Sequence, residues 1–212
     1  VILPMTHDTG SAVVAAPVIE PGFAYISSGT WSLVGTEVPA PVIDPKGLAL
    51  NITNEGGWNG TYRFLKNVLG LWLVQECRRN YARAGKQYTY EELTMLAAEA
   101  PALRSIVDPD DGTFFAPGDM PTRIADYCRR TGQPVPDGVG AIIRCVLESL
   151  ALKYRYVIES IETILGRRLS PIVVLGGGAR NNLLNQFTAD SLQRTVIGGP
   201  VEATALGNLV VQ

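Results

Sequence analysis

The run VVLGGGARNN, residues 173–182, has the composition best suited to binding chemistry. Its β-branched part predicts a strand that ends at Gly176, Gly177 and Gly178, with a helix soon after. Because glycine has no Cβ, the backbone N–H groups of such a turn can approach a phosphate, and a helix N-terminus adds partial positive charge. The alternative is a glycine-rich turn that binds no ligand.

The spacing around these glycines narrows the class of nucleotide. A dinucleotide fingerprint, G-x-G-x-x-G, needs a third glycine where this sequence has Asn181, and no acidic residue follows at the expected distance. The P-loop pattern G-x-x-x-x-G-K-[ST] does not occur in the sequence, which excludes a P-loop enzyme. A nicotinamide site therefore stays a weak alternative. Asn181 could either read the edge of a purine or cap the helix.

Gly29 and Thr30, within SSGTWSLVG, form the second candidate. They lie between two β-rich runs, which predicts a hairpin. Such a turn can present backbone N–H groups and a hydroxyl to a phosphate. Hairpin turns use glycine and threonine often, so this pattern alone does not separate a binding turn from a structural one.

Asp8, in PMTHDTGSA, is the third candidate. Phosphoryl transfer to an alcohol needs a carboxylate that orients the attacking hydroxyl and accepts its proton. An acid at the end of a short strand over residues 1–3 would suit that task. The alternative is that Asp8 caps a helix that begins at Thr9. His7 is the only histidine, so no Ser–His–Asp arrangement is supported, and we expect it to pack or hydrogen-bond on the opposite face.

The elements that would position these residues follow from periodicity and from turn residues. Strands are predicted over 23–28, 31–37, 48–53, 171–178 and 194–199, and helices over 62–83, 90–100, 137–168, 180–192 and 200–212. The stretch 101–120 is rich in Pro, Asp and Gly and is expected to be irregular. This order predicts an α/β domain with a mixed sheet and a helical insertion between the two halves of the sheet.

Composition limits the partners. The chain has 212 residues, 46% of them hydrophobic, and a net charge of −2, which gives no electrostatic case for nucleic acid or an acidic membrane surface. The apolar run 68–74 is too short to span a bilayer. Cys77, Cys128 and Cys145 are too widely spaced for a metal pair of the CxxC kind, so we expect reduced, buried thiols and a cytoplasmic protein. Because the chain opens with Val1, we also expect it to be part of a larger protein.

Taken together, THDTGSAV, ISSGTWSLVG, VVLGGGARNN and GGPVEATALGN resemble the C-terminal half of carbohydrate kinases of the FGGY family. The resemblance covers essentially the whole chain, in order, and is closest to the members that phosphorylate L-rhamnulose. It implies an actin-like ATPase (ribonuclease H-like) fold. Residues 1–212 would then be the C-terminal nucleotide-binding domain, without the N-terminal sugar-binding domain.

The resemblance also implies an activity and roles for the residues. The activity would be ATP-dependent phosphorylation of L-rhamnulose at its 1-hydroxyl, with Mg²⁺. Asp8 matches the position of the catalytic base, and Gly29 and Thr30 match a phosphate-binding turn. Gly176–Gly178 match the glycines that lie against the nucleotide, and Asn181 matches the asparagine beside the adenine. No metal ligand is assigned in this chain.

One half of a two-domain kinase would present half of a cleft. The expected partners are the sugar, the nucleotide and the missing N-terminal domain, and a homo-oligomer stays open. The segment 101–136 would shape either the rim of the cleft or an oligomer contact. Alone, the chain is expected not to turn over sugar. The alternatives are a kinase for another ketose or polyol and a non-catalytic actin-like module.

Overall fold

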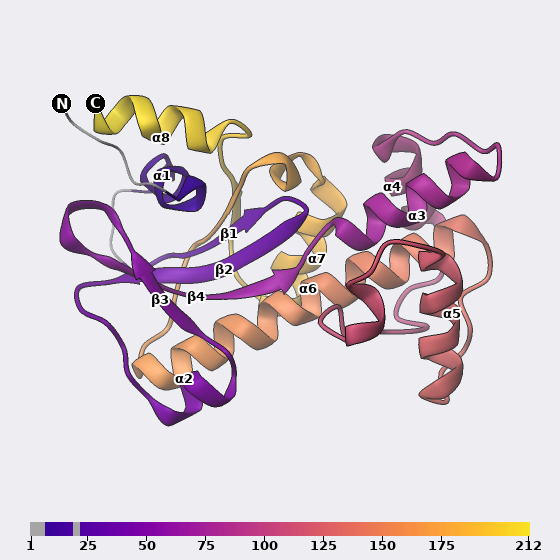
Figure 1. Cartoon of the computed structure of the whole chain (residues 1–212), viewed down its shortest axis with the longest axis horizontal. Coiled ribbons are helices and arrows are strands. Elements are labelled where there is room, and N and C mark those ends of the chain that lie inside the picture. Colours follow the sequence, from indigo (N-terminus) through magenta and orange to yellow (C-terminus); the bar gives the residue numbers. More distant parts are fainter. Residues whose placement is uncertain (1–6, 19–21) are drawn as a thin grey trace.

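A mixed six-stranded sheet with helices on both faces forms the centre of the computed structural model, which describes residues 7–18 and 22–212 (Figure 1). The strand order is β3-β4-β2-β1-β5-β6. β1 pairs antiparallel with β2 and parallel with β5, so it joins the antiparallel and parallel halves. The strands are β1 (Ala24–Ser28), β2 (Trp31–Val38), β3 (Thr53–Gly56), β4 (Tyr62–Leu69), β5 (Ile172–Leu175) and β6 (Val196–Gly198).

The helices divide between the two faces of the sheet and a separate lobe. They are α1 (Asp8–Val14), α2 (Pro45–Ala49), α3 (Trp72–Arg83), α4 (Tyr90–Glu99), α5 (Met120–Arg130), α6 (Gly138–Leu165), α7 (Asn182–Leu192) and α8 (Ala203–Val211). Figure 1 shows α1 and α8 on one side of the sheet and α6 on the other, with α3, α4 and α5 gathered beyond one end of the strands. The predicted helical insertion between β4 and β5 is therefore confirmed.

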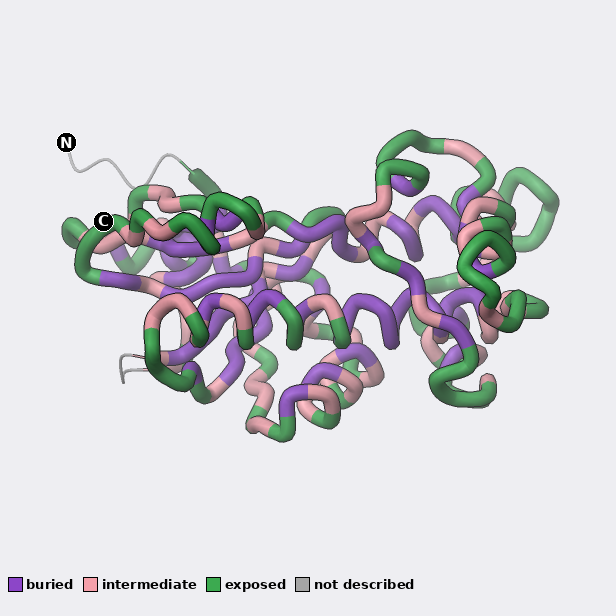
Figure 2. The backbone as a smooth tube through the Cα atoms, turned by 90° about the horizontal axis from the view of Figure 1, so that it is seen from below, coloured by how far each residue is buried: buried purple, intermediate pink, exposed green. Residues whose placement is uncertain are grey.

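The sheet has a cluster of buried hydrophobic side chains on each face, because successive side chains of a strand point to opposite faces. In β1, Ala24 and Ile26 belong to the large cluster on the α6 side, whereas Tyr25 belongs to the small cluster with Ala12 and Val13 of α1. All four residues of β5 are buried, as expected for a strand covered on both faces. Figure 2 shows the same burial running along the strands and through the middle of α6.

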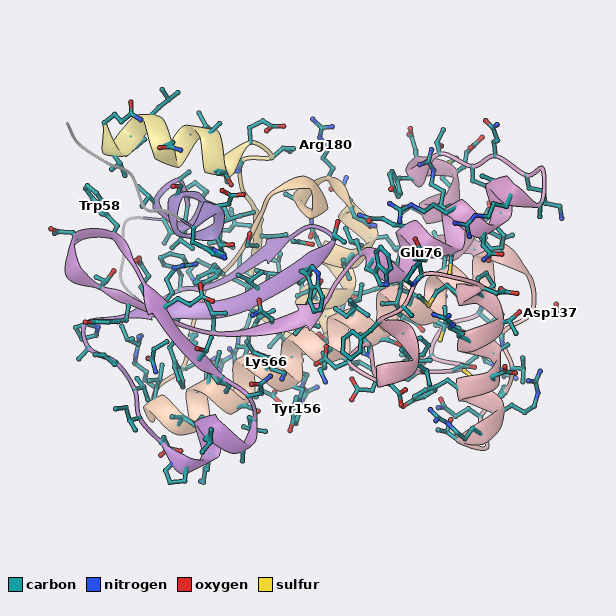
Figure 3. The ribbon with its side chains drawn as sticks, viewed as in Figure 1. Trp58, Lys66, Glu76, Asp137, Tyr156 and Arg180 are labelled. Carbon is teal, nitrogen blue, oxygen red and sulfur yellow. The ribbon has the colours of Figure 1, made fainter. Side chains whose placement is uncertain are left out.

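The 28-residue helix α6 links the two parts of the molecule. At about 1.5 Å per residue it is roughly 42 Å long, so it supports the sheet and continues into the helical lobe (Figure 1). Glu76 of α3 lies within that lobe (Figure 3). Its fully buried carboxylate forms an ion pair with Arg79 and accepts a 3.2 Å hydrogen bond from the Gly118 N–H. This carboxylate therefore holds an irregular segment against α3.

Several predicted elements need correction. Residues 62–69 form the strand β4 instead of the start of a helix, because β4 pairs with both β2 and β3 and has a buried run, 63–65, without strict alternation. The predicted strand 48–53 is wrong as well. Asp44 precedes α2 as its N-cap and accepts hydrogen bonds from the N–H groups of Lys46 and Gly47 in the first turn of the helix, and the strand begins only at Thr53. The last helix begins at Ala203, after Pro200.

The remaining expectations concern the N-terminal segment, the cysteines and the membrane. Helix α1 begins at Asp8 itself, with His7 at the N-cap position, so the alternative in which Asp8 caps the helix is wrong by one residue. The strand predicted over 1–3 lies outside the described residues. Cys77, Cys128 and Cys145 are free and buried, as expected, and burial raises the pKa of each thiol. In the described residues, none of the helices has the length and apolarity needed to cross a bilayer.

Candidate functional site

The β1–β2 hairpin places Gly29 and Thr30 at the end of the sheet that faces the helical lobe. The Gly29 N–H is used within the turn, because it donates to the Trp31 carbonyl at 2.9 Å. The Thr30 side chain is exposed, and its hydroxyl lies 3.2 Å from both Oε1 and Nε2 of Gln75 on α3. The sequence predicted that this turn would present backbone N–H groups and a hydroxyl; the Gly29 N–H is used within the turn, and the Thr30 hydroxyl is exposed to a ligand.

Tyr154 of α6 supports this hairpin from below. Its hydroxyl lies 2.7 Å from Ser32 Oγ, and both residues are buried. Burial raises the pKa of Tyr154 to about 12, so the phenol stays neutral near pH 7. The hydrogen bond between this neutral phenol and Ser32 therefore holds the start of β2 against α6.

Residues 176–178, which we call the glycine loop, lie directly beside the hairpin turn at Gly29 and Thr30. Because β5 runs parallel to β1, Gly176 and Gly178 come to rest against Ser28 at the end of β1. A Cβ on Gly178 would lie 2.0 Å from Ser28 Oγ, and Gly176 has a φ of 81°, so neither position suits another residue. Within the described residues no hydrogen bond uses the amide N–H of Gly177 or Gly178, and the buried Ser28 Oγ has no partner.

Asn181 has the capping role that one interpretation predicted. Its Oδ1 accepts a 3.0 Å hydrogen bond from the Leu184 N–H at the start of α7. The Nδ2 group is left to donate to a ligand. Both interpretations of Asn181 therefore stay compatible, since one side chain can cap the helix and line a site.

A cavity of about 630 Å³ joins these pieces. Its lining includes Gly29, Gly177, Gly178 and Asn181, which the sequence analysis had selected from segments about 150 residues apart along the chain. Its size falls in the range typical of small-molecule sites. A smaller cavity of about 210 Å³ in the helical lobe is lined by none of the predicted binding or catalytic residues.

The sequence analysis missed the opposite wall of this cavity. That wall comes from α3, α4 and α6, and it includes Gln75, Tyr90, Glu91, Thr94, Met95, Ile143 and Leu147. Tyr90 and Met95 are more than half exposed, which gives the cavity an apolar side suited to the face of a base. The sequence signal that could have pointed to this wall is the polar Gln75, which directly follows the apolar run 71–74.

Arg144 of α6 holds this wall in place. Its Nη1 lies 2.9–3.1 Å from the carbonyl oxygens of Ala97, Ala98 and Ala100, where α4 ends, and its Nε donates to Glu148 at 2.7 Å. These bonds satisfy the last carbonyls of α4 and fix that helix on α6. The side of the cavity formed by α4 is therefore held against α6 by Arg144.

Asp8 lies apart from this cavity. It is exposed at the first residue of α1, and its carbonyl accepts a 3.3 Å hydrogen bond from Thr204 Oγ1. The adjacent His7 places Nδ1 4.0 Å from Glu55, which pairs at 2.9 Å with the buried Arg63. The structure thus brings the glycine loop, the hairpin turn and Asn181 together, and it leaves Asp8 on the α1 face of the sheet.

These features fit a nucleotide. Binding a phosphate requires free hydrogen-bond donors, and the site offers two unused amide N–H groups and a buried serine hydroxyl without a partner. The glycine at position 178 is required in any case by its contact with Ser28. For a resident metal ion the support is absent: the described residues contain no group of three His, Cys, Asp or Glu side chains placed to hold one.

Comparison with known proteins gives the relationship. The family model "FGGY family of carbohydrate kinases, C-terminal domain" matches residues 24–212. The chain is 51% identical over 206 residues to rhamnulokinase of Bacteroides thetaiotaomicron, covering 97% of this chain and 42% of that protein. It is 48% identical over 212 residues to rhamnulokinase of Halalkalibacterium halodurans, covering 100% and 44%. The chain therefore spans less than half the length of these relatives.

Solved structures agree on the fold. Xylulose kinase from Rhodospirillum rubrum superposes with a TM-score of 0.69 at 20% identity, over 96% of this chain and 40% of that one. Plasmodium falciparum glycerol kinase with ADP gives 0.64 at 16% identity, over 96% and 40%. The actin-like ATPase fold predicted from the sequence is confirmed. Together with the family match over 24–212, this shows that the chain belongs to the FGGY family of carbohydrate kinases.

Proposed function

We propose that this chain is the nucleotide-binding half of a kinase that phosphorylates a ketose with ATP, and that the ketose is L-rhamnulose. The observation that carries the proposal is the cavity in which the glycine loop and the hairpin turn lie side by side, facing an apolar wall. The names of the most similar relatives, all rhamnulokinases, support the choice of sugar.

In this proposal each candidate residue has one role in binding or catalysis. The amide groups of Gly177 and Gly178 and the Thr30 hydroxyl hold the phosphates, and Asn181 Nδ2 donates to the base. Mg²⁺ bound together with the nucleotide would neutralise part of the charge of its phosphates. Asp8 orients the sugar hydroxyl and takes its proton as that oxygen attacks the terminal phosphorus, while the bond between that phosphorus and the bridging oxygen breaks and ADP leaves. Since Asp8 lies outside the cavity, the base and the nucleotide site form two separable parts.

The first test measures ADP formation by the full-length parent enzyme with L-rhamnulose and MgATP, in unaltered form and with Asp8→Asn. We expect activity in the unaltered enzyme and a loss of roughly 10²–10⁴-fold or more in the variant. Activity on a different ketose only would keep the kinase and reject L-rhamnulose. ADP formation on no sugar would favour the non-catalytic module.

The second test uses this chain alone and measures ADP binding by calorimetry. We expect saturable binding, no sugar phosphorylation, and the same ADP affinity in Asp8→Asn, because Asp8 is not part of the cavity. Saturable NAD binding without competition from ATP would contradict the nucleotide assignment. Sugar phosphorylation by the isolated chain would contradict the division into two halves.

A further inference from the structure

Two charged side chains line the nucleotide cavity, and they come from opposite walls. Arg180 follows the glycine loop, whereas Glu91 lies in the first turn of α4. In the described part of the chain, neither side chain has a hydrogen bond or an ion pair with another residue. Both charges are therefore available to a ligand, and they have opposite sign.

Arg180 belongs to the phosphate end. It ends the short 3₁₀ helix Gly177–Arg180, only two residues after Gly178, and it is exposed. Figure 3 shows its side chain rising from this loop, clear of the sheet. A guanidinium next to unused amide N–H groups adds a full charge and a forked donor to an anion site.

Glu91 lies on the side of the cavity formed by α4. Its neighbour Glu92, and not Glu91, makes the hydrogen bonds that cap this helix. The Thr89 N–H donates to Glu92 Oε2 at 2.7 Å and the Glu92 N–H donates to Thr89 Oγ1 at 3.1 Å. This capping box holds the pKa of Glu92 below its usual value and commits that carboxylate to the helix end. Glu91 instead shares the cavity-lining face of α4 with Thr94 and Met95.

A carboxylate accepts hydrogen bonds only, and it repels phosphate. A nucleotide whose phosphates lie against the glycine loop must therefore present its nucleoside part to Glu91. We propose that Glu91 accepts a hydrogen bond from the nucleoside, while Arg180 pairs with its phosphates, so that the two charges set the direction in which the nucleotide lies. This inference rests on the proposed function. The nucleoside offers two kinds of donor, the ribose hydroxyls and the exocyclic amino group of adenine.

Calorimetry on this chain tests the nucleoside end. Glu91→Ala is compared with Glu99→Ala, which removes an exposed carboxylate from the same helix outside the cavity. We expect Glu91→Ala to weaken ADP binding roughly tenfold and Glu99→Ala to leave it unchanged. If ribose is the donor, the preference for ADP over 2′-deoxy-ADP disappears in Glu91→Ala. If the amino group is the donor, the preference for ADP over IDP disappears. Unchanged affinity and unchanged preferences in Glu91→Ala would overturn this assignment.

The same titrations test the phosphate end with Arg180→Ala, and the control is Arg168→Ala, which removes an exposed arginine from the loop after α6. We expect Arg180→Ala to weaken ADP roughly tenfold, to leave adenosine unchanged and to reduce the salt dependence of ADP binding. Equal losses for adenosine and ADP, or no loss for either, would overturn the role of Arg180. Thermal unfolding of each variant confirms that it is folded. Failure of the unaltered chain to bind any adenine nucleotide would overturn the proposed function as well; binding that ignores both substitutions overturns only the orientation.

Discussion

Gly178 and Ser28 touch so closely that a Cβ on Gly178 would lie 2.0 Å from Ser28 Oγ and 2.4 Å from Ser28 Cβ. The contact arises because β1 and β5 are parallel neighbours, with Ser27 opposite Leu175, and both strands end at the same edge of the sheet. Two turns that are distant in the sequence are thereby locked together. A methyl group at position 178 would therefore push the glycine loop away from the hairpin turn.

Gly178→Ala is therefore expected to lower the free energy of unfolding by about 1–3 kcal/mol and to weaken ADP binding. Gly177→Ala is the matched control for packing, because no atom lies within 4 Å of a Cβ at that position. Adding Ser28→Gly to Gly178→Ala relieves the clash and should restore part of the lost stability. Urea unfolding measures all three. Equal destabilisation by the two alanine substitutions would contradict this account.

Local signals were enough for much of the fold. The Gly29–Thr30 turn between two β-rich runs and the long apolar stripe of α6 were both predicted correctly, because each depends on residues close in sequence. The strand β4 was missed for a tertiary reason. It lies between β2 and β3, and the burial of Arg63, Phe64 and Leu65 in succession hides the alternation that identifies a strand.

The site shows the same division. The glycines at 176–178 could be predicted as a phosphate-binding turn because the strand, the glycines and the following helix lie in one short segment of the sequence. Glu91 and Met95 were not, because they reach the cavity only through the packing of α4 on α6, which Arg144 enforces from about fifty residues away in the sequence. Asn181 could be assigned either role from the sequence, and the structure assigns its Oδ1 to the cap.

The ion pair of Arg63 and Glu55 gives a prediction about stability. Arg63 is 1% exposed, donates to the Gly56 carbonyl at 3.0 Å and pairs with Glu55 at 2.9 Å. Glu55→Ala leaves a buried guanidinium without its counter-charge and should lower the free energy of unfolding by about 3–5 kcal/mol. The double variant Glu55→Ala/Arg63→Met should be closer to the unaltered protein, since no unpaired charge remains.

The control for this pair is the exposed ion pair of Arg129 and Asp126, whose side chains are 63% and 61% exposed. Arg129→Ala should change the free energy of unfolding by less than about 1 kcal/mol. Urea unfolding of the unaltered protein and of these three variants measures the differences. A double variant less stable than Glu55→Ala alone would show that the guanidinium contributes mainly through packing.

Alkaline pH should destabilise the chain through its buried phenols. Burial raises the pKa of Tyr154 to about 12, and the pKa values of Tyr25 and Tyr81 are raised for the same reason. An unfolded tyrosine ionises near a pKa of about 10, so above that pH the unfolded state loses protons that the folded state keeps. Stability is therefore complete below about pH 10 and falls as the pH rises toward 12.

Tyr154→Phe isolates one of these groups. Near pH 8 it should lower the free energy of unfolding by about 1–3 kcal/mol, because Ser32 loses its buried partner. Above about pH 10 the unaltered protein loses about 1.4 kcal/mol of stability per pH unit through Tyr154, which stays protonated only in the folded state. The variant lacks this phenol and does not lose that part, so the difference in the free energy of unfolding should shrink. Urea unfolding at pH 8 and at higher pH measures the difference. A constant difference across that range would show that Tyr154 ionises equally easily in both states.

The contact between α8 and α1 predicts how Asp8 is held. A Cβ on Gly207 would lie 1.7 Å from the Ser11 carbonyl oxygen, a backbone atom that cannot move aside alone. Gly207→Ala favours the helix itself by about 1 kcal/mol, yet it should destabilise the chain by about 1–3 kcal/mol, because α8 must lift away from α1. Leu209→Ala, on the exposed side of α8, is the control and should have little effect.

Lifting α8 would also remove the hydrogen bond from Thr204 to the Asp8 carbonyl. Hydrogen exchange in Gly207→Ala should therefore rise in both α8 and α1, while ADP affinity stays unchanged because neither helix lines the cavity. In the full-length enzyme the same substitution should lower kcat more than it raises the KM for ATP. Loss of ADP binding together with slow exchange in α1 would contradict this arrangement, because it would mean that α8 supports the nucleotide cavity and not the segment that carries Asp8.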